Sequence, residues 1–244
     1  LASVGIYSYN GYVKSSKKSS AKNTMMQIGL AQTEFYSNSG FYWYNGLDED
    51  DDSSCTATGD DGATEAIGAG LFDIEFNTLC ESDSTPMHIG SLPGYLRGIH
   101  ESIRIENWSP GDCVIHNHPY KGASHSPDIA IVMPVFNEGD LVGFSANTAH
   151  HVDIGAATPG LIIDVPDVWA EGMLMDGVKL FNEGVRNEDL WKYIRDNTRV
   201  PDLVMGDLEA QIASAELGVR RFEELLDKYG KNTVMQATKQ LMDY

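Results

Sequence analysis

The chain has 244 residues, of which 42% are hydrophobic and 22% charged, a balance typical of a folded globular protein with room for one or two domains. Its formal net charge of −19 argues against nucleic acid or an anionic membrane as a partner, because both need a basic surface. The three cysteines (Cys55, Cys80 and Cys113) lack CxxC spacing, so they predict neither a metal site nor a disulfide framework of their own.

The first 36 residues carry the pattern of an amphipathic helix. Side chains that suit one helix face recur at steps of three and four residues: Ala21, Met25, Ile28, Gln32 and Phe35. Turn-forming residues at 37–40 predict the end of this helix. The acidic run at 48–52 lacks the spaced ligands and central glycine of an EF-hand, so we interpret it as part of a solvated loop.

The composition changes between residues 60 and 70, which is where we place a domain boundary. Beyond it, short apolar runs at 113–115, 129–133 and 141–145 are bounded by turn-forming residues and predict strands. The break at 137–140 predicts a four-residue hairpin loop that joins the last two strands in antiparallel fashion.

From about Asp189 onward the pattern is helical. One apolar seam steps by three and four residues, and Gly230 then stands where a helix terminator is expected; the seam comprises Leu208, Ile212, Ala215, Val219, Phe222, Leu225 and Tyr229. The predicted fold class is therefore α+β. A long N-terminal helix and loop segment precedes a mixed α/β module with antiparallel strands and a C-terminal amphipathic helix.

Five of the seven histidines fall between residues 116 and 153. His125 and Asp128 precede the strand that starts at residue 129, and His150 ends the strand that begins near residue 141, so antiparallel pairing brings the three together at the end away from the turn. Two imidazoles and one carboxylate suit Mn, Fe or Zn and leave coordination positions open. The alternative is a set of loop histidines that cap turns. We interpret His88 and His100 as structural, with His88 the better site candidate.

Residues 70–244 contain a series of short motifs, at 85–94, 111–112, 117–122, 125–128, 149–155, 171–172, 197–199 and 206–211. In these motifs and their order the segment resembles the hydantoinase B family, which includes the B-type subunits of ATP-dependent hydantoinases, 5-oxoprolinase and the large subunits of acetone and acetophenone carboxylases. The resemblance implies a divalent metal, with manganese favoured and iron or zinc possible, on His125, Asp128 and His150. It also implies catalytic roles close to that metal for His118, His151 and Asp153.

The resemblance further implies a metal-dependent subunit of a cytoplasmic, oligomeric enzyme that acts on cyclic amides or ketones as small-molecule substrates. The chain contains no Walker-type phosphate-binding loop, which agrees with the use of ATP by a hydantoinase A-like partner subunit. Family members are usually much longer, so we expect residues 70–244 to be a partial catalytic domain.

Two stretches of the first 67 residues, the segment 1–13 and the aromatic stretch 35–44, carry a different resemblance. They are similar to the latter part of the long helix of a type IV pilin and to its exit into the variable loop, so residues 1–67 resemble a type IV pilin. This resemblance implies the alternative function of a structural subunit in an extracellular pilus filament. The two compartments conflict, and a chimera joined near residues 67–72 would account for that.

Overall fold

The computed structural model describes residues 68–82, 86–160 and 164–242. The helix expected over residues 1–36 and the pilin-like segment 1–67 lie outside the described residues and stay predictions. The described part is a mixed α/β fold around one seven-stranded antiparallel sheet of order β2-β1-β5-β4-β3-β6-β7. Its strands are β1 (Gly68–Phe72), β2 (Thr78–Glu81), β3 (Cys113–His116), β4 (Asp128–Asn137), β5 (Asp140–His150), β6 (Val178–Asn182) and β7 (Val185–Arg186).

The hairpin of β4 and β5 forms the centre of the sheet. Its strands pair from Asp128 opposite His150 to Asn137 opposite Asp140, with one irregularity near Val135. The predicted four-residue loop is wrong, because Asn137 and Asp140 themselves pair and only Glu138 and Gly139 form the turn. Both turn residues have positive φ, 53° and 88°, which is the conformation that matches the twist of a tight hairpin.

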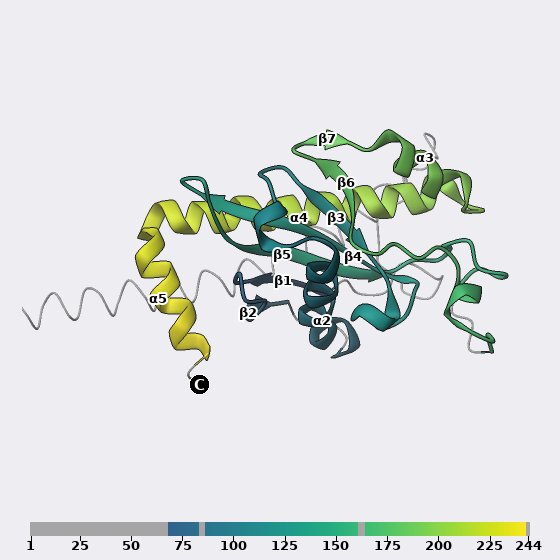
Figure 1. Ribbon diagram of the computed structural model, residues 1–244, viewed down its shortest axis with the longest axis horizontal. Helices are drawn as coiled ribbons and strands as arrows, with labels where there is room; N and C mark the ends of the chain where they lie inside the picture. Colours follow the sequence, from purple (N-terminus) through teal and green to yellow (C-terminus); the bar gives the residue numbers. More distant parts are fainter. Residues whose placement is uncertain (1–67, 83–85, 161–163, 243–244) are drawn as a thin grey trace, which may run out of the picture.

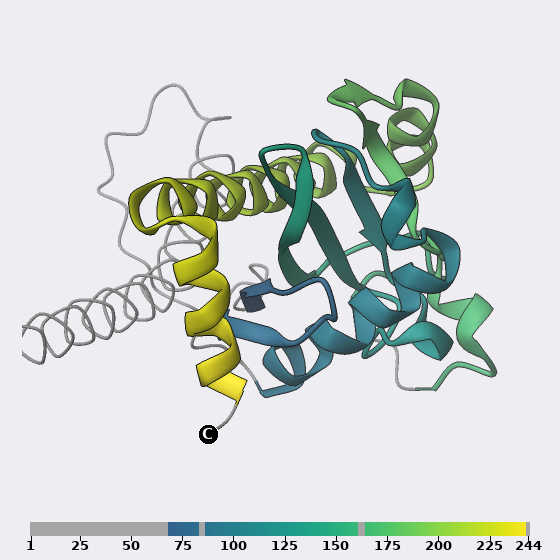
Figure 2. The same ribbon diagram turned by 60° about the vertical axis from the view of Figure 1, so that its left-hand side comes forward.

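Two helices cover opposite faces of this sheet: α2 (Pro86–Ser102) covers one and α4 (Pro201–Tyr229) the other (Figures 1 and 2). Successive side chains of a strand point to opposite faces, so each central strand contributes to both layers of the core. The α4 layer includes Ile129, Ile131, Leu208, Ile212 and Ala215. The α2 layer includes Val132, Phe144, Leu92, Leu96 and Ile99.

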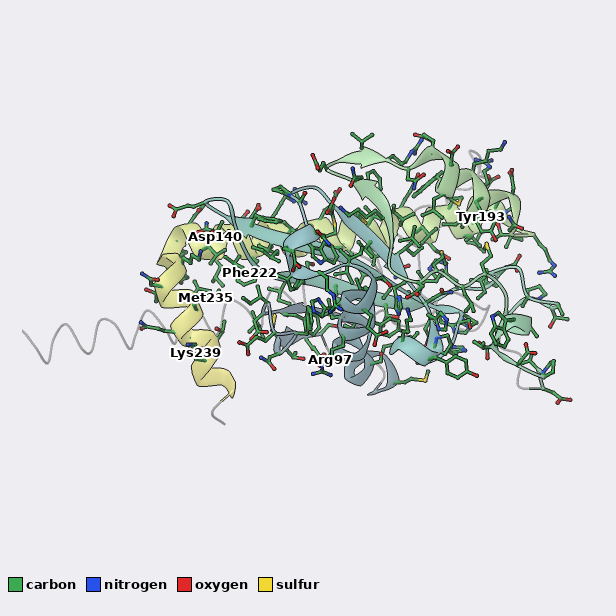
Figure 3. The ribbon with its side chains drawn as sticks, in the orientation of Figure 1. Arg97, Asp140, Tyr193, Phe222, Met235 and Lys239 are labelled. Carbon is green, nitrogen blue, oxygen red and sulfur yellow. The ribbon has the colours of Figure 1, made fainter. Side chains whose placement is uncertain are left out.

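Helix α4 confirms the predicted apolar seam and ends, as predicted, at Gly230. The chain then turns into α5 (Lys231–Met242), which continues from the end of α4 beside the hairpin tip (Figure 1). Phe222, labelled on α4 in Figure 3, is buried with Val135 and Val142 of the hairpin and Val234 of α5. The shorter helix α3 (Glu188–Asp196) packs against α4.

Helix α2 was not predicted, and it has an unusual composition with Pro93, Gly90, Gly94 and Gly98 inside it. Two of these glycines are needed for packing. A Cβ added at Gly98 would lie 1.7 Å from the carbonyl oxygen of Lys121 in the short helix η2 (Pro119–Lys121), and one at Gly94 would lie 3.1 Å from the Gly122 oxygen. The two backbones therefore touch. No helix in the described ranges is long and apolar enough to cross a membrane.

Candidate metal centre

The adjoining ends of β4 and β5 gather His125, Asp128 and His150 into one cluster. Nε2 of His125 lies 2.8 Å from Oδ1 of Asp128, and Nδ1 of His150 lies 2.9 Å from the same oxygen. The two nitrogens lie 3.0 Å apart, and the two rings stack with centroids 4.8 Å apart. The three side chains thus converge as the sequence predicted, while metal binding by them stays a prediction.

The register of the hairpin and the alternation of side chains along each strand explain this convergence. Asp128 is the first residue of β4 and pairs with His150, the last residue of β5, so both side chains project from the α2 face. His125 precedes Asp128 by one tight turn, in which the Asp128 amide donates to the His125 carbonyl at 3.1 Å. Tyr95 of α2 fixes the same point, because its hydroxyl donates to the Asp128 carbonyl at 3.0 Å.

The donor atoms fit a divalent ion better than they fit one another. Three close contacts join two imidazole nitrogens and one carboxylate oxygen. These atoms can carry at most two N–H protons, so the three contacts cannot all be ordinary hydrogen bonds. Ligand atoms about 2.1 Å from an ion lie about 3.0 Å apart at neighbouring octahedral positions and about 3.4 Å apart at tetrahedral ones. The observed separations of 2.8, 2.9 and 3.0 Å are close to this range, so one ion could contact all three atoms.

The electrostatics keep Asp128 ionised. Burial alone would raise the pKa of this carboxyl, but hydrogen bonds from His125, His150, His88 and Ser124 outweigh burial and hold the pKa well below its ordinary value. Asp128 is fully buried, whereas the side chains of His125 and His150 are 20% and 21% exposed. The buried end of the cluster, which we call its floor, is therefore the Asp128 carboxylate, and the two histidines reach the surface.

His88 lies at this floor, although the sequence favoured a structural role for it. It is buried on α2, and its Nε2 lies 3.5 Å from Oδ2 of Asp128, the carboxylate oxygen that faces away from the other two histidines. The Ser124 hydroxyl donates to the same oxygen. Sequence reasoning underrated His88 because α2 was not foreseen. His100, on the same helix, instead contacts Phe76 and Arg104.

His118 is the residue before η2 and is half-buried. Its ring lies 6.0 Å from that of Tyr120, and its Nδ1 is buried without a hydrogen-bond partner among the described residues. His118 does not belong to the group of close ligand atoms formed by His125, Asp128 and His150. Its catalytic role therefore stays a prediction.

His151 and Asp153, expected beside the metal, bind other parts of the fold. His151 is fully buried on the α4 face, opposite its neighbour His150, and its Nε2 lies 2.7 Å from Oε1 of Gln211. Burial lowers the pKa of His151. The buried Asp153 carboxylate accepts from the Arg199 guanidinium at 2.9 Å and from the Arg199 backbone amide. Within the described ranges neither side chain hydrogen-bonds to the cluster, so a catalytic role for either remains an expectation from the resemblance.

Two proteins with named functions are similar in sequence to this chain. A protein of Pseudomonas sp. (strain NS671), provisionally named as the B-type subunit of a D-/L-hydantoinase, is 46% identical over 186 residues, covering 74% of this chain and 31% of that protein. The caprolactamase beta subunit of Pseudomonas jessenii is 33% identical over 174 residues, covering 71% of this chain and 30% of that protein. The chain therefore spans less than a third of the length of these relatives.

Two solved structures are similar in fold to this chain. The crystal structure of the ATP-dependent caprolactamase from Pseudomonas jessenii superposes with a TM-score of 0.68 at 32% identity, covering 72% of this chain and 30% of that one. A nucleotide-free acetone carboxylase shares the fold at a TM-score of 0.72, with 16% identity over 91% of this chain and 28% of that one. Residues 64–244 match the hydantoinase B/oxoprolinase family over their whole length, and the chain belongs to that family.

Proposed function

We propose that this chain is the metal-binding part of a B-type subunit in an ATP-dependent enzyme that acts on cyclic amides or ketones. One observation carries the proposal: a chain of this family presents two imidazole nitrogens and a carboxylate oxygen within 2.8–3.0 Å of one another. Its relatives supply the reaction class, since their names include a hydantoinase, a caprolactamase and 5-oxoprolinases.

His125, Asp128 and His150 would hold the ion. Manganese is favoured by the resemblance to acetone carboxylase-like proteins, and iron or zinc suits the same donors. When bound, the ion supplies Lewis-acid chemistry, that is, polarisation of a carbonyl or phosphoryl oxygen and stabilisation of negative charge on it. The chain's own contribution is to keep Asp128 anionic and the two imidazoles aligned. Because the histidine side is exposed, the substrate would approach from there.

We further propose that ATP is used by a partner subunit. The relatives are designated as B-type and beta subunits, which are names for members of multi-subunit enzymes, and one related structure is titled ATP-dependent. A partner that phosphorylates the carbonyl oxygen of the substrate would leave the metal site to complete ring opening or carboxylation. The cytoplasmic location expected for such an enzyme stays part of this proposal.

A reconstitution experiment tests the reaction class. The chain is mixed with a hydantoinase A-like protein and ATP, and hydantoin, 5-oxoproline, caprolactam and acetone are supplied in turn. We expect substrate-dependent ATP hydrolysis with product formation for one of them, and loss of product with His150→Ala. The matched control is His100→Ala, since His100 lies on α2 away from the cluster and is expected to leave turnover unchanged. Product formation that survives His150→Ala would contradict the assignment.

A further inference from the structure

The short loop that carries two of the proposed ligands is held at its middle residue. Ser126 lies between His125 and Asp128, is fully buried, and has both of its backbone polar groups bound by side chains from distant segments. Its amide donates to Oε2 of Glu171 at 3.0 Å, and its carbonyl accepts from Nδ2 of Asn117 at 2.6 Å. The neighbouring backbone groups bond within the hairpin ends, since the Asp128 amide donates to the His125 carbonyl and the His151 amide to the Pro127 carbonyl. Ser126 has its two backbone polar groups held by side chains instead.

Asn117 joins three segments at one buried point. Its Nδ2 also donates to the Met173 carbonyl at 2.9 Å, and its Oδ1 accepts from the Met175 amide at 2.6 Å. The side chain is fully buried and uses both of its amide protons and its carbonyl oxygen. Asn117 therefore ties the ligand loop to the segment around residues 173–175.

Glu171 reaches the loop from the other side, and its own place is fixed by the residue that follows it. Glu171 ends the short helix η3 (Val168–Glu171), and Gly172 then has φ of 121°. A Cβ at Gly172 would lie 2.4 Å from the Ile154 oxygen, so only glycine allows the chain to pass this close to the segment after β5. The carboxylate is thereby directed at the Ser126 amide.

We infer that Glu171 and Asn117 are positioning residues of the metal centre, which hold Ser126 so that the His125 imidazole faces the Asp128 carboxylate. Neither side chain contacts the ligand atoms themselves; both act through the backbone between two ligands. The inference rests on the proposed metal function and deepens it. Residues that orient ligands in this way typically change metal affinity by about 10- to 100-fold when they are replaced.

Three single variants test the inference in the full chain by Mn²⁺ titration, followed by electron paramagnetic resonance. Glu171→Ala removes the acceptor, and we expect Mn²⁺ to bind about 10- to 100-fold more weakly at unchanged stoichiometry. Glu171→Gln keeps an acceptor oxygen and should restore most of the affinity. Asp167→Ala is the matched control, because Asp167 caps η3 by accepting from the Ala170 amide and does not touch Ser126. Equal affinity in Glu171→Ala and the unsubstituted chain, or equal loss in Asp167→Ala, would overturn the inference.

A second measurement, on the metal-free chain, separates this inference from the proposed function. Hydrogen exchange of the Ser126 amide should become at least about tenfold faster in Glu171→Ala and stay unchanged in Asp167→Ala. If the unsubstituted chain binds no Mn²⁺, the proposed metal function fails, and this exchange rate still decides whether Glu171 holds the loop. Unchanged exchange in Glu171→Ala would refute the positioning role whatever the metal result.

Discussion

His116 lies at the end of β3 with no exposed side-chain surface, and both of its ring nitrogens are engaged. Nδ1 accepts from the Gly177 amide at 3.1 Å, so the ring proton of the neutral form is on Nε2, which lies 3.1 Å from the Lys121 carbonyl. Burial lowers the pKa of His116 from 6.5 to about 4, although the Lys121 carbonyl and the Asp176 carboxylate oppose that shift. Protonation of Nδ1 would also break its contact with Gly177.

The sign of the pH effect follows from this depressed pKa. Below pH 6.5 the unfolded chain takes up a proton at His116, whereas the folded chain does so only near pH 4. The contribution of neutral His116 to stability is therefore complete above pH 6.5 and is lost as pH falls through the window from 6.5 to 4. At 1.36 kcal/mol per pKa unit, the loss amounts to about 3 kcal/mol.

The variant His116→Gln isolates this contribution, since an amide does not titrate. Urea unfolding of both proteins at several pH values between 7 and 4 gives the free energy of unfolding at each pH. We expect the unsubstituted chain to lose about 3 kcal/mol more than the variant across this range, because all other titrating groups are common to both. Two parallel stability profiles would show that the pKa of His116 is not lowered in the folded chain.

Further predictions concern packing and can be checked by urea unfolding at pH 7. Gly98→Ala should destabilise the fold by several kcal/mol, because its Cβ would meet the Lys121 carbonyl oxygen, whereas Gly90→Ala on the same helix has open space and should stabilise by up to about 1 kcal/mol. Equal effects of the two would contradict the close contact of α2 with η2. Phe222→Ala should cost about 3–5 kcal/mol, since the ring is fully buried, and a loss below about 1 kcal/mol would count against that core. Asp140→Ala, which removes an exposed ion pair with Lys231, should leave the free energy of unfolding nearly unchanged, and a clear loss would show that α5 depends on this pair.

The sequence predicts those parts of the fold in which one periodic pattern dominates. The seam of α4 keeps its three- and four-residue steps because one helix face packs on the sheet throughout. The β4–β5 hairpin was predicted because turn residues divide two apolar runs, and its pairing alone brings Asp128 opposite His150. Most of the candidate metal centre could therefore be predicted before any tertiary contact was known.

The parts that were missed depend on contacts between distant segments. Helix α2 contains glycines that weaken a helix by about 1 kcal/mol each, and the need for Gly94 and Gly98 becomes visible only where the backbone of residues 121–122 packs against them. His88 was underrated for the same reason. His150 and His151 read as one pair in the sequence, yet alternation in the strand sends His151 to Gln211 on the other face. The length of the hairpin loop was overestimated because Asn137 and Asp140, which pair with each other, were counted as loop residues.

The proposed binding of a divalent metal ion by His125, Asp128 and His150 can be measured directly. The purified chain and the double variant His125→Ala, Asp128→Ala are incubated with Mn²⁺ and desalted, and their metal content is determined by elemental analysis. We expect near-stoichiometric metal in the unsubstituted chain and its loss in the variant, with the fold retained by circular dichroism. Equal metal content in both proteins, or none in either, would contradict it.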